Sequence, residues 1–281
     1  MLRFLAGALI IGSAVIILLS LYTFYLYTHP RRYITSVTPQ DLNLNFEDLS
    51  LTTSDGIDLA AWLIPNKDSD AVIIVCHGYP ADKGDVLQFA SFLKDDYNLF
   101  FFDFRCMGKS GGTYSTIGDK ERLDLAAAIT YLKKRGFNKI GAFGFSMGGA
   151  VIIMVNSPDI KAAVTDSAFA NLESLVHTAY GNLGWLRFPF VFFTKVHSRL
   201  FLNLDIKSVS SLKSMKELKF PILLIHAESD EIVSVDNALL LHSANPESAL
   251  WIIPGALHGQ TYSIMPEEYE NKILSFFKTH L

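Results

Sequence analysis

Continuous apolar runs, separated by short polar segments, dominate the pattern of this chain beyond its N-terminal segment. The run AVIIVC at 71–76 is apolar at every position, which is typical of a strand buried on both faces of a mainly parallel sheet. Two strand-like runs between residues 44 and 65 flank Ser54-Asp55-Gly56, a hairpin turn signal. Further strands are predicted at 98–103, 139–143, 161–166, 220–226 and 249–253.

Helices are predicted between these strands, because apolar residues there recur every three or four positions. Residues 119–135 give the clearest case: Asp119 and Glu121 stand in the first turn, basic residues stand in the last, and Gly136 follows as a stop signal. Other helices are expected near 86–93, at 147–156, from about 234 and from about 266. Strands that alternate with helices predict an α/β fold with a mostly parallel central sheet flanked by helices.

The segment 171–218 interrupts this alternation, because it places nearly fifty residues between two predicted strands. Such a connection is far longer than usual for an α/β unit. Residues 183–193 within it are rich in Leu, Trp and Phe. We expect the segment to be an apolar cap or lid over a site. A pair of helices that only packs on the core is an equally open alternative.

The N-terminal segment is apolar in a different way, since residues 4–27 contain no charged side chain. At a rise of about 1.5 Å per residue, such a helix can cross a hydrocarbon core of about 30 Å with some tilt. A cleaved signal peptide needs a shorter apolar region and a small-residue cleavage site. We therefore expect an uncleaved membrane anchor at 1–32 and a separate domain at 33–281. One arginine precedes the apolar run and two follow it, so the charges indicate no orientation.

Composition narrows the function classes. The net charge is −4 and no basic stripe is present, so the sequence predicts no nucleic-acid partner. The chain has only two cysteines, Cys76 and Cys106, which excludes a disulfide-stapled scaffold. No cluster of cysteine and histidine has metal-ligand spacing, and the sequence predicts neither a metal nor another cofactor.

Gly144-Phe145-Ser146-Met147-Gly148 matches the pattern GxSxG and stands between a predicted strand and a predicted helix. In that context the glycines leave room for a sharp turn that lifts the serine hydroxyl above the sheet. A chance match to the pattern is common, but a match at a strand-to-helix junction is not. The sequence therefore predicts Ser146 as a catalytic nucleophile.

A serine nucleophile needs a general base, and the base needs a carboxylate that orients it. Of the eight histidines, only His258 stands in a loop after the last predicted strand. Asp230 follows the preceding strand, so the chain order Ser146, Asp230, His258 is the one that α/β folds with this motif use. Asp166, at the end of an earlier strand, is the alternative acid.

The charge that develops on the substrate oxygen requires two backbone N–H groups. Met147 follows the nucleophile at a predicted helix N-terminus, so its N–H is one candidate. Tyr79 follows the strand at 71–76, and its N–H is the second. His77 in the same turn is expected to make structural hydrogen bonds rather than to take part in chemistry.

These segments together resemble the α/β-hydrolase superfamily. The residues that carry the resemblance are His77-Gly78, Asp103-Phe104-Arg105-Cys106-Met107-Gly108-Lys109-Ser110, Gly144 to Gly148, Asp230 and His258. The chain is most similar to membrane-anchored α/β-hydrolase-domain proteins and to bacterial hydrolases described as dipeptidyl-aminopeptidase-like, over about residues 44–281. In that family an Asp-x-Arg-Gly-x-Gly-x-Ser segment shapes the turn after its strand. Cys106 stands where glycine is usual, which affects the expected backbone there but not the triad.

The triad, the anchor and the insertion together predict a membrane-anchored serine hydrolase. Its expected substrates are small-molecule or lipid acyl compounds, whose ester or thioester bond is cleaved through an acyl-serine intermediate. A serine peptidase of the aminopeptidase kind is an alternative, because it would use the same mechanism. A non-catalytic relative that serves in binding is a further alternative. The sequence defines neither the acyl and leaving groups nor an oligomeric state.

Overall fold

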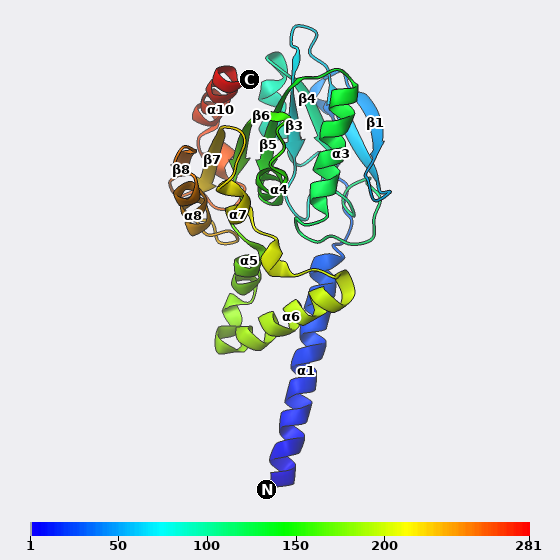
Figure 1. Ribbon diagram of the computed structural model, residues 1–281, viewed down its shortest axis with the longest axis vertical. Coiled ribbons are helices and arrows are strands. Elements are labelled where there is room, and N and C mark those ends of the chain that lie inside the picture. Colours follow the sequence, from blue (N-terminus) through cyan, green and yellow to red (C-terminus); the bar gives the residue numbers. More distant parts are fainter. Residues whose placement is uncertain (1) are drawn as a thin grey trace.

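The structure, a computed structural model, describes residues 2–281 as a central sheet between helices, with one long helix that leaves this body (Figure 1). The strands are β1 (Glu47–Thr52), β2 (Asp58–Ile64), β3 (Ala71–Cys76), β4 (Asn98–Phe102), β5 (Lys139–Phe145), β6 (Ile160–Asp166), β7 (Ile222–Ala227) and β8 (Ala249–Ile253). The α-helices are α1 (Leu2–Thr28), α2 (Leu87–Ala90), α3 (Glu121–Lys134), α4 (Met147–Val155), α5 (Leu172–Ala179), α6 (Arg187–Leu202), α7 (Ser211–Met215), α8 (Asp236–Ala244), α9 (Thr261–Ile264) and α10 (Pro266–His280). Short 3₁₀ helices are η1 (Pro39–Leu42), η2 (Ser91–Asp95), η3 (Gly181–Leu186) and η4 (Ile206–Ser208).

The sheet has the strand order β1-β2-β4-β3-β5-β6-β7-β8. β1 pairs with β2 and β2 with β4 in antiparallel register, and the remaining neighbours are parallel. The predicted hairpin and the predicted mostly parallel sheet are both confirmed. Parallel neighbours point their carboxyl ends to the same edge, so the loops after β3, β5, β7 and β8 meet there.

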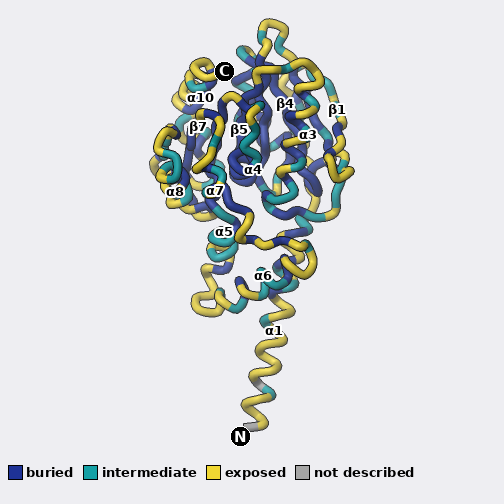
Figure 2. Tube along the Cα trace, in the orientation of Figure 1, coloured by how far each residue is buried: buried dark blue, intermediate teal, exposed yellow. Residues whose placement is uncertain are grey.

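Both faces of the sheet are covered, which explains the uninterrupted apolar runs. In β3, Val72 and Ile74 pack in the core layer that holds α3, α4 and α7. Ile73 and Val75 pack in the opposite layer, with α2 and α10. A strand whose alternate residues are buried in two different cores must be apolar at every position. Figure 2 shows the resulting buried centre between exposed outer helix surfaces.

Helix α1 projects from the body and is exposed over most of its length (Figures 1 and 2). Its segment Arg3–Thr28 is long and apolar enough to cross a membrane. The predicted insertion forms α5, η3, α6, η4 and α7 between β6 and β7. Within it, α6 crosses the C-terminal half of α1 (Figure 1), where Ser20 Oγ lies 3.1 Å from His197 Nε2.

Two helix predictions differ from the structure. Asp119 lies ahead of α3, which begins at Glu121, because the buried Glu121 carboxylate accepts hydrogen bonds from Ser115, Thr116 and Gly118 and so belongs to the preceding turn. The helix expected near 86–93 is split into α2 and η2. The split lies at Ala90, whose φ of −126° interrupts the α-helical ladder.

Candidate active site

Ser146 occupies the junction at which β5 ends and α4 begins. Its φ of 51° and ψ of −115° are unusual for a residue with a side chain, and such a conformation costs on the order of 1–3 kcal/mol. The flanking glycines make the turn possible by close approach. A Cβ on Gly144 would lie 2.6 Å from the Gly149 nitrogen, and one on Gly148 would overlap the Cys76 carbonyl oxygen. The predicted strand–turn–helix context of the motif is therefore present.

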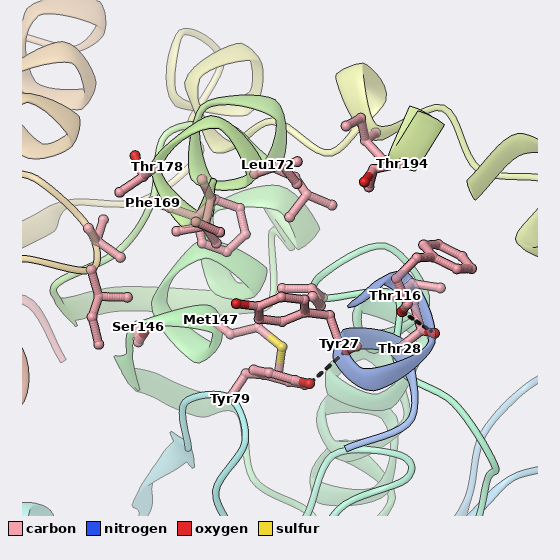
Figure 3. Close-up of a pocket in the computed structure, with 18 of the residues that line it drawn as sticks. Tyr27, Thr28, Tyr79, Thr116, Ser146, Met147, Phe169, Leu172, Thr178 and Thr194 are labelled. Atoms are coloured by element: carbon pink, nitrogen blue, oxygen red, sulfur yellow. Dashed lines mark hydrogen bonds between the residues drawn. The ribbon is translucent and has the colours of Figure 1, made fainter. Parts of the chain in front are cut away.

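Sheet register brings a second loop beside this turn. Cys76, the last residue of β3, is paired with Gly144 of β5, so the segment after β3 passes next to Ser146. Gly78 in that segment has room for no side chain, since a Cβ there would lie 2.9 Å from the Phe145 ring. The same loop carries Tyr79, which lines one pocket together with Ser146 and Met147 (Figure 3).

His258 and Asp230 are joined by a short hydrogen bond. His258 Nδ1 lies 2.6 Å from Asp230 Oδ2, and the two residues come from the loops after β8 and β7. Because Nδ1 is engaged, Nε2 is the ring nitrogen left to face the pocket that His258 and Ser146 line together. The ring also packs on Phe145, with centroids 5.0 Å apart. The structure thus brings the three predicted triad residues to one end of the sheet.

The Asp230 carboxylate is held in its ionised form. Burial opposes its ionisation, but the hydrogen bond from His258 and those from the backbone of Val233 and Ile232 outweigh burial, and the pKa of Asp230 falls below its ordinary value. A negative charge at this point fixes the orientation of the imidazole and favours a proton on Nδ1.

His226 is a neighbour of this acid whose role the pattern of the chain did not indicate. It lies in β7, where its Nε2 is 2.7 Å from the Val233 carbonyl oxygen and 3.7 Å from Asp230 Oδ2. The imidazole therefore fastens the loop that carries Asp230. The only signal for it in the sequence was a polar residue inside an otherwise apolar strand.

Asp166, the alternative acid, has other partners. Its carboxylate accepts hydrogen bonds from Thr261, from Tyr269 at 2.9 Å and from Ser167 at 2.9 Å, whereas His258 is bonded to Asp230. Burial raises the pKa of Asp166, and these hydroxyl groups oppose that rise. Its backbone carbonyl accepts from the Ser146 N–H at 2.7 Å, so Asp166 supports the turn at Ser146.

The two candidate N–H donors, Met147 and Tyr79, line the same pocket as Ser146. Met147 is the first residue of α4, and the first N–H groups of a helix lack a partner inside that helix. Tyr79 follows β3, and its phenol donates to the Tyr27 carbonyl oxygen at 2.6 Å. His77 is fully buried; its Nδ1 faces the Gly78 carbonyl at 2.6 Å and its Nε2 accepts from the Phe104 N–H at 2.9 Å. These bonds fit the structural role expected of His77.

Cys106 adopts the backbone conformation that the usual glycine would take. Its φ is +65°, and its N–H donates to the Gly111 carbonyl at 2.7 Å. The turn is held at its start by the buried Asp103, whose carboxylate accepts from Lys83 Nζ at 2.6 Å and from the Lys109 N–H at 2.8 Å. The substitution therefore leaves the local fold intact, and both cysteines are free and buried.

The pocket beside Ser146 has a volume of about 430 Å³, within the range of small-molecule sites. Its polar end holds Ser146 and His258, and the rest is mainly apolar (Figure 3). The insertion supplies one wall, with Leu172 and Val176 of α5. The last turns of α1 supply another, with Phe24, Tyr27 and Thr28, a contribution that the sequence did not reveal.

Comparison with known proteins agrees with this architecture. Residues 87–281 match the prolyl oligopeptidase family. The α/β hydrolase domain-containing protein WAV2 of Arabidopsis thaliana is 26% identical over 87% of this chain and 82% of its own length. YNL320W of Saccharomyces cerevisiae, described as an uncharacterized membrane protein, is 25% identical over 85% of this chain and 82% of its own length.

Among solved structures, the esterase Pf2001 of Pyrococcus furiosus is 30% identical and superimposes with a TM-score of 0.77, covering 90% of this chain and 98% of the esterase. The family match spans more than half of the chain, and the sheet order and the strand–serine–helix turn agree with it. The chain therefore belongs to the prolyl oligopeptidase family, within the α/β-hydrolase superfamily.

Proposed function

We propose that this protein is a membrane-anchored serine hydrolase that cleaves carboxylic ester or thioester bonds of acyl substrates. The observation that carries the proposal is the hydrogen bond of 2.6 Å between His258 and Asp230, at a pocket that His258 lines together with Ser146. In this proposal residues 1–32 are the anchor, residues 33–281 are the catalytic domain and residues 171–218 are its cap.

The mechanism follows from these roles. Ser146 Oγ attacks the substrate carbonyl carbon while His258 Nε2 takes the hydroxyl proton, and Asp230 stabilises the imidazolium that forms. The N–H groups of Met147 and Tyr79 stabilise the oxyanion. Collapse of this intermediate breaks the bond to the leaving alcohol or thiol, which receives the proton from His258. Water, deprotonated by His258, then attacks the acyl-serine and releases the carboxylic acid and the free serine.

The ester assignment draws support from the pocket and from the similarity to an esterase of known structure. The mainly apolar lining suits an acyl chain. The family description favours a second candidate, a serine peptidase that cleaves aminoacyl amides by the same steps. A non-catalytic binding role is the third, and it is the one that lacks a specific supporting contact.

Covalent labelling tests the nucleophile. The full-length protein in detergent is treated with a fluorophosphonate probe, and Ser146→Ala is compared with Ser229→Ala, an exposed serine in the loop before Asp230. We expect labelling of the wild type and of Ser229→Ala, and none of Ser146→Ala. Labelling that survives in Ser146→Ala contradicts the assignment.

A substrate panel separates the candidate reactions. Matched acyl esters, acyl thioesters and aminoacyl amides are compared by kcat/KM with the wild type and Ser146→Ala. We expect hydrolysis of esters and thioesters that depends on Ser146. A clear preference for the amides would assign the peptidase activity instead, and no turnover of any class would favour the binding role.

A further inference from the structure

The exposure of side chains in α1, the proposed anchor, changes along the helix. Near its start, Leu9 and Ile10 are about 70% exposed. Near its end, Phe24 is 7% exposed and Thr28 is 6% exposed, because the cap and the catalytic domain cover them. Both residues line the same pocket as Ser146 and His258 (Figure 3). A helix that served only as a tether would need no buried residues at the site.

Hydrogen bonds fix this end of α1 to the catalytic domain. The Tyr79 phenol donates to the Tyr27 carbonyl at 2.6 Å, and the Ser115 N–H donates to the Thr28 carbonyl at 2.7 Å. Tyr79 is also the residue whose N–H is proposed to stabilise the oxyanion, and it lines the pocket with Ser146. The last carbonyl groups of α1, which a helix leaves without internal partners, are therefore used to hold α1 against the catalytic loop.

A second set of contacts fixes α1 to the cap. Thr23 Oγ1 lies 2.7 Å from the Tyr180 hydroxyl, which lies 3.1 Å from Thr194 Oγ1 of α6. The Phe24 ring packs against the ring of His197 in α6, with centroids 5.9 Å apart. The last two turns of α1 thus close one side of the pocket, between α6 and the loop that carries Tyr79.

The outer surface of the cap indicates where this pocket lies relative to a bilayer. Helix α6 crosses α1 below the domain (Figure 1), and it carries exposed large apolar side chains at Phe188, Phe192 and Leu200. Trp185 of η3 is 76% exposed. An amphipathic helix of this kind lies in the membrane interface when a neighbouring helix spans the membrane. If α1 spans, this apolar surface meets the same bilayer.

We propose that the last two turns of α1 form the wall of the acyl pocket that selects chain length, and that the substrate is a long-chain lipid ester from the membrane that α1 spans. This inference rests on the proposed hydrolase function. The acyl chain lies along Phe24 while its carbonyl carbon reaches Ser146. The anchor is then part of the substrate site, and substrate reaches the serine without crossing water.

A series of acyl esters tests the wall. Full-length Phe24→Trp and Phe24→Ala are compared with the wild type on p-nitrophenyl acetate, octanoate and palmitate in detergent. Leu26→Trp and Leu26→Ala serve as matched controls, because Leu26 lies on the exposed side of the same turn. We expect Phe24→Trp to lower kcat/KM for palmitate about tenfold, with acetate changed by less than about twofold, since a filled apolar pocket discriminates by chain length.

The outcomes separate this inference from the proposed function. A wild type that hydrolyses none of the esters overturns the hydrolase proposal itself. A wild type that hydrolyses them, with equal losses for acetate and palmitate in Phe24→Trp, overturns the wall. Equal chain-length shifts in the Phe24 and Leu26 variants also overturn it.

Vesicles test the source of the substrate. Full-length protein is reconstituted in phosphatidylcholine vesicles that contain 4-methylumbelliferyl palmitate, or in vesicles without it that are mixed with ester-loaded vesicles lacking protein. We expect fluorescence to rise at least about tenfold faster when protein and ester share a membrane, because transfer of a long chain through water is slow. Equal rates in the two arrangements overturn delivery from the membrane.

Discussion

The two ends of the pocket are built by different means. At the polar end, Ser146, Asp230 and His258 are held by short hydrogen bonds and by backbone turns that glycine alone permits. At the apolar end, Phe24 and Val176 come from α1 and α5, segments about 150 residues apart in the chain, and are held by packing. In the proposed function, reactivity therefore depends on local turns, whereas substrate selection depends on contacts between helices that are distant in the chain.

The largest expected effect is at the polar end. Asp230→Asn removes the charge that orients His258, and we expect kcat to fall by about 10³–10⁴-fold with the melting temperature little changed. The matched control is Asp236→Asn, which alters an exposed carboxylate on α8 and should leave kcat unchanged. Steady-state kinetics with an ester substrate measure both. A fall below tenfold for Asp230→Asn would mean that another group orients the base.

The pKa of Asp230 sets the direction of its pH dependence. Because the folded-state pKa lies below the ordinary 3.8, its contribution to stability is fully present above pH 3.8 and is lost as the pH falls through the folded-state value. Asp230→Asn should therefore remove part of the pH dependence of unfolding only on the acid side of pH 3.8. An Asn variant whose unfolding curve differs from the wild type chiefly between pH 5 and 8 would contradict this assignment.

The next effect concerns the loop that supports the polar end. Lys83→Met leaves Asp103 as a buried charge without its cation, and we expect the free energy of unfolding to fall by about 3–5 kcal/mol. Lys139→Met breaks an exposed pair with Asp70 and should cost about 0–1 kcal/mol. Chemical denaturation compares the two variants. Equal losses would show that burial does not set the strength of the Lys83 pair.

A smaller effect tests the turn itself. Gly148→Ala places a methyl group against the Cys76 carbonyl, and we expect a loss of about 1–3 kcal/mol in stability together with a shifted nucleophile and reduced kcat. Gly181→Ala is the control, because a Cβ there meets nothing within 4 Å. Wild-type kcat in Gly148→Ala would show that the turn accommodates a side chain.

The smallest effect is at the apolar end. Phe192→Glu puts a charge on the exposed face of α6, and we expect the rate of hydrolysis of an ester embedded in vesicles to fall about threefold. Hydrolysis of acetate in detergent should not change. Lys134→Gln, on the exposed end of α3, makes the same change of one charge away from α6. Equal losses in both variants would show that the effect does not depend on the exposed face of α6.

The sheet could be predicted from the sequence because its cause is local. The run at 71–76 is β3 without a change of boundary, since a strand buried on both faces requires apolar residues throughout. The positions of Ser146, Asp230 and His258 after the strands β5, β7 and β8 could be predicted for the same reason. The loops that follow parallel strands lie at one edge of the sheet, so residues in these loops are close in space even when they are far apart in the chain.

The rest depends on contacts that no local pattern encodes. Phe24 stands among many apolar residues of α1, and nothing in its neighbours distinguishes it from Leu26, although one is buried and the other exposed. His226 was recognisable only as a polar residue in an apolar strand, and its use at Val233 depends on how the next loop folds back. Helix α2 ends at Ala90 because of the backbone angles of that residue, which its residue type does not indicate.

The hydrogen bond from Tyr79 to the Tyr27 carbonyl has a practical consequence for expression. A shortened form that starts at residue 33, made to obtain a soluble enzyme, would lose Phe24, Tyr27 and Thr28 together. The phenol of Tyr79 would lose its acceptor, Tyr180 of the cap would lose its hydrogen bond with Thr23, and the pocket would open on one side. Such a form would keep Ser146, Asp230 and His258, but its preference among acyl substrates would change.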